Sequence, residues 1–283
     1  MPTTITTVNV NGIRAAVKQR SEVNPGMLAW LSSTDADIVL LQEIRADHDQ
    51  AHDALRPALA AGWHLSMTDS VVKGHAGVGV LSRSAPTAVR VGFGSAEFDA
   101  TGRYLETDFD DATLGALTVA SLYLPKGAAA PTASSSAKDA EKYAEKKRFL
   151  AEFGEHLTRT ARRRRGVVVG GDWNIAPAEV DIKNWKGNLR SPGFLPHERD
   201  WVAQRLTGGW RDVVRELHPD AEAGPFSWWS WRGKAFDNDS GWRIDYQLAT
   251  ATLARRAVRA RTERASAYDR RWSDHAPVTV VYE

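Results

Sequence analysis

Residues 167–176 read VVVGGDWNIA, a short β-branched run that passes through two glycines into Asp172, Trp173 and Asn174. Valine favours strands, and a short apolar run bounded by glycine is typical of a strand that is buried on both faces. An acid and an amide directly after such a strand place polar groups at the edge of a sheet. The same arrangement recurs along the chain and decides the fold class that the sequence predicts.

Six further apolar runs are predicted as buried strands, at residues 5–10, 38–41, 78–81, 117–122, 244–249 and 278–282. Helices are predicted at residues 27–31, 50–60, 138–164 and 197–206. Hairpin-like strand pairs are expected within residues 77–91 and 103–123. This mixture predicts an α/β (α+β) fold of stacked mixed sheets covered by helices, in preference to a purely parallel doubly wound sheet.

Length and composition narrow the class of protein. The 283 residues suit one domain spanning 1–283, and the absence of cysteine excludes disulfides and thiolate metal sites. The first ten residues carry no basic segment and no long apolar stretch, so we expect no signal peptide, no membrane span and a cytoplasmic protein.

Positive charge is clustered, although the formal net charge is only +2. One cluster comprises Arg159 and residues 162–165. A second runs from Arg255 to Arg264, with Arg270 and Arg271 just beyond it. Such clusters can attract a phosphate backbone, and the alternative is a solvated arginine-rich face. Residues 127–137, rich in Ala, Ser, Thr and Pro, are predicted as a surface loop.

Polar side chains stand at one end of nearly every predicted strand. They are Asn9, Asn11, Glu43, Tyr123, Asp172 and Asn174 after strands, and Asp245, Asp274 and His275 at or just before strand starts. Strands of opposite direction place the end of one beside the start of the next, so alternating strands would collect these groups at one sheet edge. Each residue alone could be a turn residue, but their coincidence predicts a single site.

A site rich in carboxylates, with one histidine and no cysteine, offers the hard oxygen ligands that Mg²⁺ or Mn²⁺ prefers. Magnesium keeps several waters and needs only one or two carboxylates from the protein. The remaining groups are then free to activate water and to stabilise a leaving oxygen, which phosphodiester hydrolysis requires.

Five motifs, in order along nearly the whole chain, resemble the exonuclease III / abasic-site (AP) endonuclease family of the endonuclease/exonuclease/phosphatase superfamily. They are residues 8–15 (VNVNGIRA), 41–43 (LQE), 170–176 (GGDWNIA), 241–246 (GWRIDY) and 273–278 (SDHAPV). The resemblance implies a four-layered α/β sandwich, in which two packed mixed β-sheets are flanked by helices.

The resemblance also implies roles for the residues at the strand ends. Glu43 would be the main Mg²⁺ ligand, with Asn9, Asn11 and Asp274 near the metal or its waters. Asp172 would activate the attacking water or protonate the leaving group.

The other catalytic residues follow from the same motifs. Asn174 would orient the water and the phosphate. His275, held by Asp245, would contact the scissile phosphate, and Tyr123 would hydrogen-bond the phosphate or the leaving oxygen.

DNA would be contacted by Asn11, Arg14, Lys126, Trp228 and Trp242. Trp228 and Trp242, with Ile244, resemble the pocket that receives an extruded abasic sugar. The alternative for both tryptophans is a place in the core. Two positions depart from the family pattern: Val8 replaces an aromatic residue, and Lys126 replaces an amide. A lysine there could still reach a phosphate as a point charge.

The function implied is a metal-dependent DNA phosphodiesterase of base-excision repair, acting as a monomer on double-stranded DNA with abasic sites or 3′ ends. It would cut 5′ to abasic sites, remove nucleotides and blocking groups from 3′ ends, or do both. The alternative is a superfamily phosphoesterase for a phospholipid or inositol phosphate, against which the ordered motifs argue. Retention of Glu43 and Asp172 argues against an inactive binding module, and no lysine stands out for β-lyase chemistry.

Overall fold

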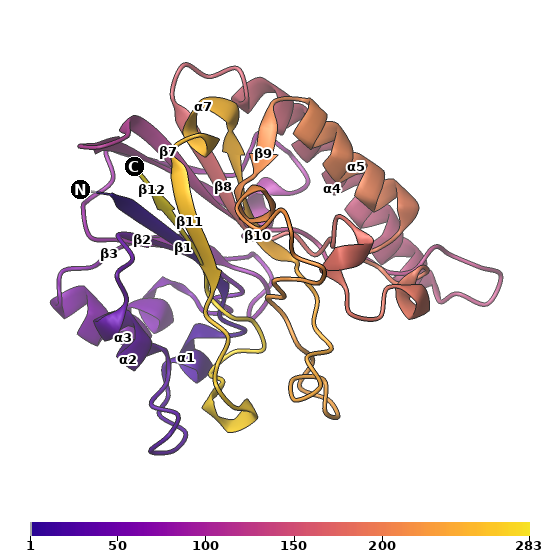
Figure 1. Ribbon diagram of the computed structural model, residues 1–283, viewed down its shortest axis with the longest axis horizontal. Coiled ribbons are helices and arrows are strands. Elements are labelled where there is room, and N and C mark those ends of the chain that lie inside the picture. Colours follow the sequence, from indigo (N-terminus) through magenta and orange to yellow (C-terminus); the bar gives the residue numbers. More distant parts are fainter. Residues whose placement is uncertain (1) are drawn as a thin grey trace.

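Two six-stranded mixed β-sheets pack face to face in residues 2–283, the part of the chain that the computed structural model describes (Figure 1). The first sheet has the order β11 (Ala257–Thr262), β12 (Val278–Tyr282), β1 (Thr3–Asn9), β2 (Ile38–Gln42), β4 (Val78–Ser82) and β3 (His64–Thr68). Only β1 and β2 are parallel among its paired strands in the described residues.

The second sheet has the same plan. Its order is β5 (Ala88–Val91), β6 (Tyr104–Asp111), β7 (Gly115–Tyr123), β8 (Gly166–Asp172), β10 (Asp245–Thr250) and β9 (Trp210–Asp212). The central pair, β7 and β8, is parallel, and each described neighbour pairs antiparallel.

Helices cover the outer faces of both sheets, and alternation along the strands decides which side chains meet them. In β2, Leu40 faces the core between the sheets, whereas Leu41 faces outward into a second apolar cluster that includes Leu55 of α3 (His48–Ala60). α2 (Met27–Ser33) lies beside α3, and α1 (Ile13–Ala16) follows β1 (Figure 1). On the opposite side, Phe149 and Phe153 of α4 (Ala137–Thr160) pack on the second sheet, with α5 (Pro196–Thr207) alongside. The predicted four-layered α/β sandwich is therefore confirmed.

The seven predicted strands are all present, with ends shifted by at most three residues, and each predicted helix is present. The hairpin expected within residues 103–123 is confirmed as β6 and β7. The hairpin expected within residues 77–91 is wrong, because β4 pairs with β2 and β3 whereas β5 pairs with β6 in the other sheet. The link between them is held at both sheets, since Arg83 donates its N–H to Asp37 and Thr87 donates its N–H to Asp108.

Part of the arginine clustering is structural. Arg163 and Arg165 form ion pairs with Glu106 and Asp108 at 2.8 and 3.1 Å, and residues 257–262 form the edge strand β11. Residues 128–136 lie mostly exposed before α4, as the predicted surface loop requires. Two short helices, α6 (Val213–Glu216) and α7 (Ala251–Ala254), flank β10 in sequence. None of the helices in residues 2–283 is long and apolar enough to cross a membrane.

Candidate active site

The strand ends with polar side chains meet at one edge of the two sheets. β10 runs antiparallel to β8 with Asp245 opposite Asp172, so the start of one strand lies beside the end of the other. β12 runs antiparallel to β1, which brings Asp274 and His275, just before Val278, to the end of β1. β2 and β7 run parallel to β1 and β8 and end at the same edge. The site is therefore a consequence of strand direction.

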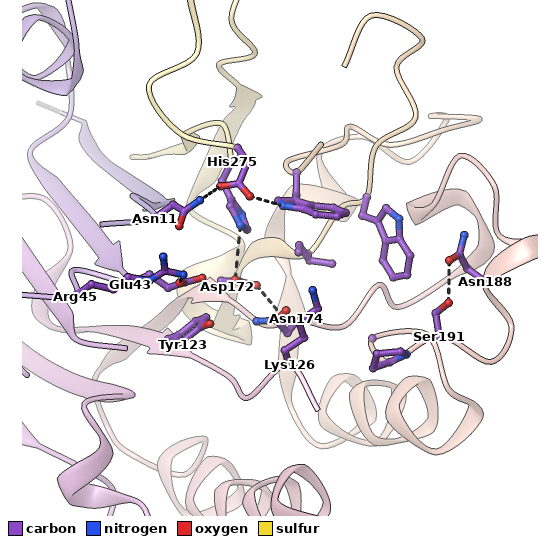
Figure 2. A pocket seen from close by; sticks show the side chains of 16 residues that line it. Asn11, Glu43, Arg45, Tyr123, Lys126, Asp172, Asn174, Asn188, Ser191 and His275 are labelled. Carbon is purple, nitrogen blue, oxygen red and sulfur yellow. Dashed lines mark hydrogen bonds and ion pairs between the residues drawn. The ribbon is translucent and has the colours of Figure 1, made fainter. Parts of the chain in front are cut away.

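This edge holds a cavity of about 390 Å³ (Figure 2). Most side chains predicted for the site line it: Asn11, Glu43, Tyr123, Lys126, Asp172, Asn174, Trp228, Trp242, Asp274 and His275. Asn9 and Asp245 are fully buried and touch the lining residues from behind. Arg14 lines an adjoining groove that shares Asn11 and Arg45 with the cavity.

Asn9 joins two of the carboxylates. Its Nδ2 donates to Glu43 Oε1 at 2.8 Å and to Asp172 Oδ2 at 2.9 Å, while its Oδ1 accepts the backbone N–H of Asn11. Both amide hydrogens and the amide oxygen are thus engaged. Asn9, which is itself fully buried, therefore holds Glu43 and Asp172 at a defined spacing.

The loops after β1 and β8 repeat one local structure. The N–H of Asn11 donates to Asn9 Oδ1, and the N–H of Asn174 donates to Asp172 Oδ1, both at 2.9 Å. Asn11 and Asn174 have φ of 49° and 47°, in the left-handed region that asparagine tolerates better than most residues. Glu43, after β2, also has a positive φ of 53°, which is less favourable for its side chain. Backbone strain of this kind collects at functional sites.

Asp172 lies among acids. Its burial raises the pKa of the Asp172 carboxyl to about 7, and the charges of Asp245 and Glu43 act in the same direction. A carboxyl group that exchanges its proton near neutral pH is suited to acid–base work.

His275 is held by an acid on one side and faces another. Its Nδ1 lies 2.8 Å from Asp245 Oδ2, and its Nε2 lies 3.9 Å from Asp172 Oδ2. Ser227 Oγ donates to the same oxygen of Asp245 at 2.7 Å and so fixes that carboxylate. Burial lowers the pKa of His275, but the charges of Asp245 and Asp172 outweigh it and raise the pKa to about 10. The ring is therefore a cation at neutral pH.

Asp274 is held in place by two side-chain donors. Its Oδ1 accepts from Asn11 Nδ2 at 2.8 Å and its Oδ2 accepts from Trp228 Nε1 at 3.0 Å (Figure 2). Glu43 forms an ion pair with Arg45, which also lines the cavity. Two carboxylates thus face the cavity with their orientations set by neighbours.

Tyr123 and two tryptophans complete the wall. Burial raises the pKa of Tyr123 well above its ordinary value, and Glu43 and Asp172 add to this, so the phenol keeps its proton. Trp228 and Trp242 meet edge to face with ring centroids 6.3 Å apart. They line the cavity and pack against a small cluster around Ile244, so this side of the cavity is apolar.

The sequence matches a known family over nearly its whole length. A profile described as the Endonuclease/Exonuclease/phosphatase family matches residues 6–275. The chain belongs to this family. Exodeoxyribonuclease III of Haemophilus influenzae is 31% identical over 281 residues, which are 97% of this chain and 98% of that protein. These matches identify an enzyme of the exodeoxyribonuclease III / AP endonuclease type, a phosphodiesterase.

Solved structures of the family superpose over almost the entire chain. A 3′ phosphatase, NExo, from Neisseria, bound to a product DNA hairpin, has a TM-score of 0.82 at 28% identity, covering 99% of both chains. An AP endonuclease from Archaeoglobus fulgidus has a TM-score of 0.81 at 26% identity, again covering 99% of both chains.

A metal ion has candidate ligands in this member of the family. Asp172, Asp245 and His275 offer ligand atoms within 4.8 Å of one another. Glu43 and Asp274 offer further carboxylate oxygens to the same cavity.

Several residues of the site were not foreseen from the sequence. Arg45 could have been assigned to the site from the sequence, because it stands two residues after Glu43, a predicted metal ligand. Ser227, Asn188 and Ser191 carry no such signal. Ser227 reaches Asp245 only through the fold, and Asn188 and Ser191 enter the cavity from the segment between β8 and α5.

Proposed function

We propose that this protein is a DNA repair nuclease that cuts the backbone 5′ to abasic sites, removes nucleotides and blocking groups from 3′ ends, or does both. The observation that carries the proposal is the meeting, in one cavity, of an acidic group with a near-neutral pKa, Asp172, a cationic histidine, His275, and an apolar aromatic wall. The DNA-bound Neisseria relative, which shares the fold over 99% of both chains, supports it. The cavity draws on elements from β1 to the residues before β12, which supports one catalytic domain over residues 1–283 acting as a monomer.

Magnesium fits the donor set. Mg²⁺ takes oxygen ligands and keeps several waters, so Glu43 and Asp274 would hold it, with Asn9 and Asn11 fixing their carboxylates. When bound, the ion would offset negative charge on the phosphoryl oxygens. The cluster around His275 suits magnesium less well, because the imidazole Nδ1 already faces Asp245.

Asp172 is the proton acceptor in this proposal. In its ionised form it takes a proton from the attacking water, and a pKa near 7 leaves much of it ionised at neutral pH. Asn174 orients the water and the phosphate. Its own position is fixed, because its backbone N–H donates to Asp172 and its Nδ2 donates to the carbonyl of Leu124 at 3.0 Å.

His275 and Tyr123 act as donors. The protonated imidazole presents Nε2–H to a phosphoryl oxygen while Asp245 holds Nδ1–H, so the cation stabilises charge that grows as the P–O bond breaks. Tyr123 keeps its proton and donates it in a hydrogen bond to the phosphate or the leaving oxygen.

The remaining side chains grip DNA. Arg14 and Lys126 are exposed cations beside the cavity and would contact phosphates. Trp228 and Trp242 would receive an extruded abasic sugar, since extrusion is easiest where no base must be unstacked.

Cleavage of labelled duplexes tests this function. We expect a duplex with one abasic analogue to be cut 5′ to the lesion with Mg²⁺ and left whole with EDTA. Shortening of an intact duplex, or release of phosphate from a 3′-phosphate end, would add the 3′-end activities. If none of the three duplexes is altered, the DNA repair proposal fails, and phospholipid or inositol phosphate hydrolysis is assayed instead.

Glu43→Gln tests the metal assignment. Removing the charge from the proposed ligand should lower kcat by at least ~10²-fold and raise the Mg²⁺ concentration needed for half activity about tenfold or more. Glu97→Gln is the control, because Glu97 is an exposed acid paired with Arg148 on the surface. Equal metal requirements for Glu43→Gln and wild type would remove Glu43 from the ligand set.

A further inference from the structure

A fully buried ion pair lies behind the cavity wall. Lys146 of α4 and Glu198 of α5 are 2% and 1% exposed, and their Nζ and Oε1 atoms are 2.6 Å apart. Neither side chain lines the cavity. Apolar residues of similar size would pack two helices at least as well, because burying a charged pair has a large desolvation cost. The pair therefore calls for a role other than helix packing.

Lys146 directs its other hydrogen bonds to the active-site loops. An ammonium has three donors. Besides Glu198, its Nζ donates to the backbone carbonyl of Asn174 at 3.0 Å and to that of Lys126 at 3.2 Å. One cation thus ties together the loop that follows β8 and the loop that follows β7.

Glu198 extends the tie to a third loop. Its Oε2 accepts the backbone N–H groups of Gly193 at 2.7 Å and Leu195 at 3.0 Å. Gly193 lines the cavity, and its carbonyl accepts the N–H of Ala176 at 2.8 Å. The segment before α5 is therefore joined to the segment after β8.

Two glycines show how closely these loops approach one another. A Cβ at Gly127 would lie 2.6 Å from Lys146 Cδ, and a Cβ at Gly193 would lie 2.9 Å from the carbonyl oxygen of Asn174. Both glycines have positive φ, of 73° and 89°. The chain leaves space for the lysine stem and for contact between loops.

We propose that the Lys146–Glu198 pair is a positioning device that sets the three loops carrying Lys126, Asn174 and Gly193 for catalysis without touching the substrate. The inference rests on the proposed function. Misplacement of a catalytic group by about 1 Å can lower a rate by roughly 10²-fold, so the pair can matter greatly to turnover.

The double variant Lys146→Met with Glu198→Gln tests the proposal. Methionine keeps much of the stem, and glutamine keeps an oxygen for the two N–H groups, so no buried charge is left unpaired. We expect the folded variant to lose about 10²-fold in kcat on the abasic duplex. The Mg²⁺ concentration for half activity should stay unchanged, because neither residue contacts Glu43 or Asp274.

Glu106→Gln is the matched control. Glu106 is also 2% exposed and pairs with Arg163 at 2.8 Å, but it lies in the middle of β6 and does not line the cavity. We expect it to lower Tm and leave kcat unchanged. A double variant that lowers Tm as Glu106→Gln does and keeps the wild-type kcat would show that the Lys146–Glu198 pair is merely structural.

Glu198→Asp gives a second reading if the double variant does not fold. It keeps the charge but is one methylene too short to hold Lys146 and both N–H groups together, so kcat should again fall with the fold intact. Unchanged kcat would overturn the proposal. Wild type is run in the same assay. If wild type fails to cut the duplex, the proposed function is wrong. If wild type cuts the duplex and both variants cut it at the same rate, only the positioning role is refuted.

Discussion

Asp172 shows how a single side chain is prepared for chemistry at the expense of stability. It sits at the end of a strand, is 1% exposed, and shares its surroundings with Asp245 and Glu43. These conditions raise its pKa to about 7, which means that the folded protein resists ionisation of this group. The unfolded chain, where the carboxyl is solvated, does not.

The pH dependence of Asp172→Asn follows from this shift. The folded pKa is raised, so the stabilising contribution of protonated Asp172 is fully present below the unfolded pKa and is lost as pH rises through 7. Each pKa unit is worth about 1.4 kcal/mol, so the free energy of unfolding of Asp172→Asn relative to wild type should increase by up to ~4 kcal/mol between pH 4 and pH 8. Urea unfolding in EDTA at both pH values measures it.

A constant offset is expected on top of this trend. Asparagine can accept only one of the two hydrogen bonds that Asp172 takes from Asn9 and Asn174, and this loss is the same at each pH. Asp53→Asn, at an exposed carboxylate paired with Arg56, serves as control and should show no trend. If the difference in free energy of unfolding between Asp172→Asn and wild type is independent of pH, Asp172 has an ordinary pKa.

For single residues, the sequence predicts membership of the site from their place relative to the strands. Glu43, Asp172 and Asn174 follow apolar runs, so the sequence alone assigns them to one sheet edge. Lys146 and Glu198 could not be assigned in this way, because both lie inside helices where a charged residue normally faces solvent, and only the packing of α4 on α5 buries them.

At the scale of elements, the parallel pair β7–β8 carries both Tyr123 and Asp172 to the site. Their register places Tyr123 beside Asp172 and Leu122 beside Gly171. The strands approach so closely there that a Cβ on Gly171 would lie 1.9 Å from the backbone oxygen of Leu122. Backbone atoms cannot move aside as a flexible side chain can, so the glycine is required for this pairing.

Gly171→Ala should therefore lower the free energy of unfolding by about 3 kcal/mol or more, because the overlap forces the two strands apart. Activity should fall as well, since Tyr123 and Asp172 would separate. Gly166→Ala, at the start of the same strand, is the control: its nearest neighbours are side-chain atoms of Leu253 at 3.3 Å, which can shift. Thermal unfolding compares the two, and equal losses would mean that the β7–β8 contact tolerates a side chain.

The elements themselves were largely predictable because apolar runs of β-branched residues are short and well bounded. The failure at residues 77–91 has a physical origin: adjacency in sequence suggested a hairpin, but β4 is buried on both faces in one sheet while β5 is a largely exposed edge of the other. β11 is not predictable from its sequence, because its arginines mask the alternating pattern of an edge strand.

For the whole molecule, a net charge of only +2 does not prevent DNA binding if the cations lie near the site. Arg14 is exposed in a groove adjoining the cavity, next to Lys18 and Arg45. Arg162 is also exposed, but it lies just before the start of β8, whose seven residues put it roughly 20 Å from Asp172 at the other end. The two arginines therefore form a matched pair, one near the site and one remote.

The salt dependence of binding to an uncleaved abasic duplex in EDTA separates these two positions. Each phosphate contact releases counterions, so Arg14→Ala should weaken binding and reduce the slope of log K against log salt by about one. Arg162→Ala should leave both affinity and slope unchanged. If Arg162→Ala reduces the slope as much as Arg14→Ala does, DNA is held by charge spread over the whole surface, and the groove beside the cavity is not the DNA-binding site.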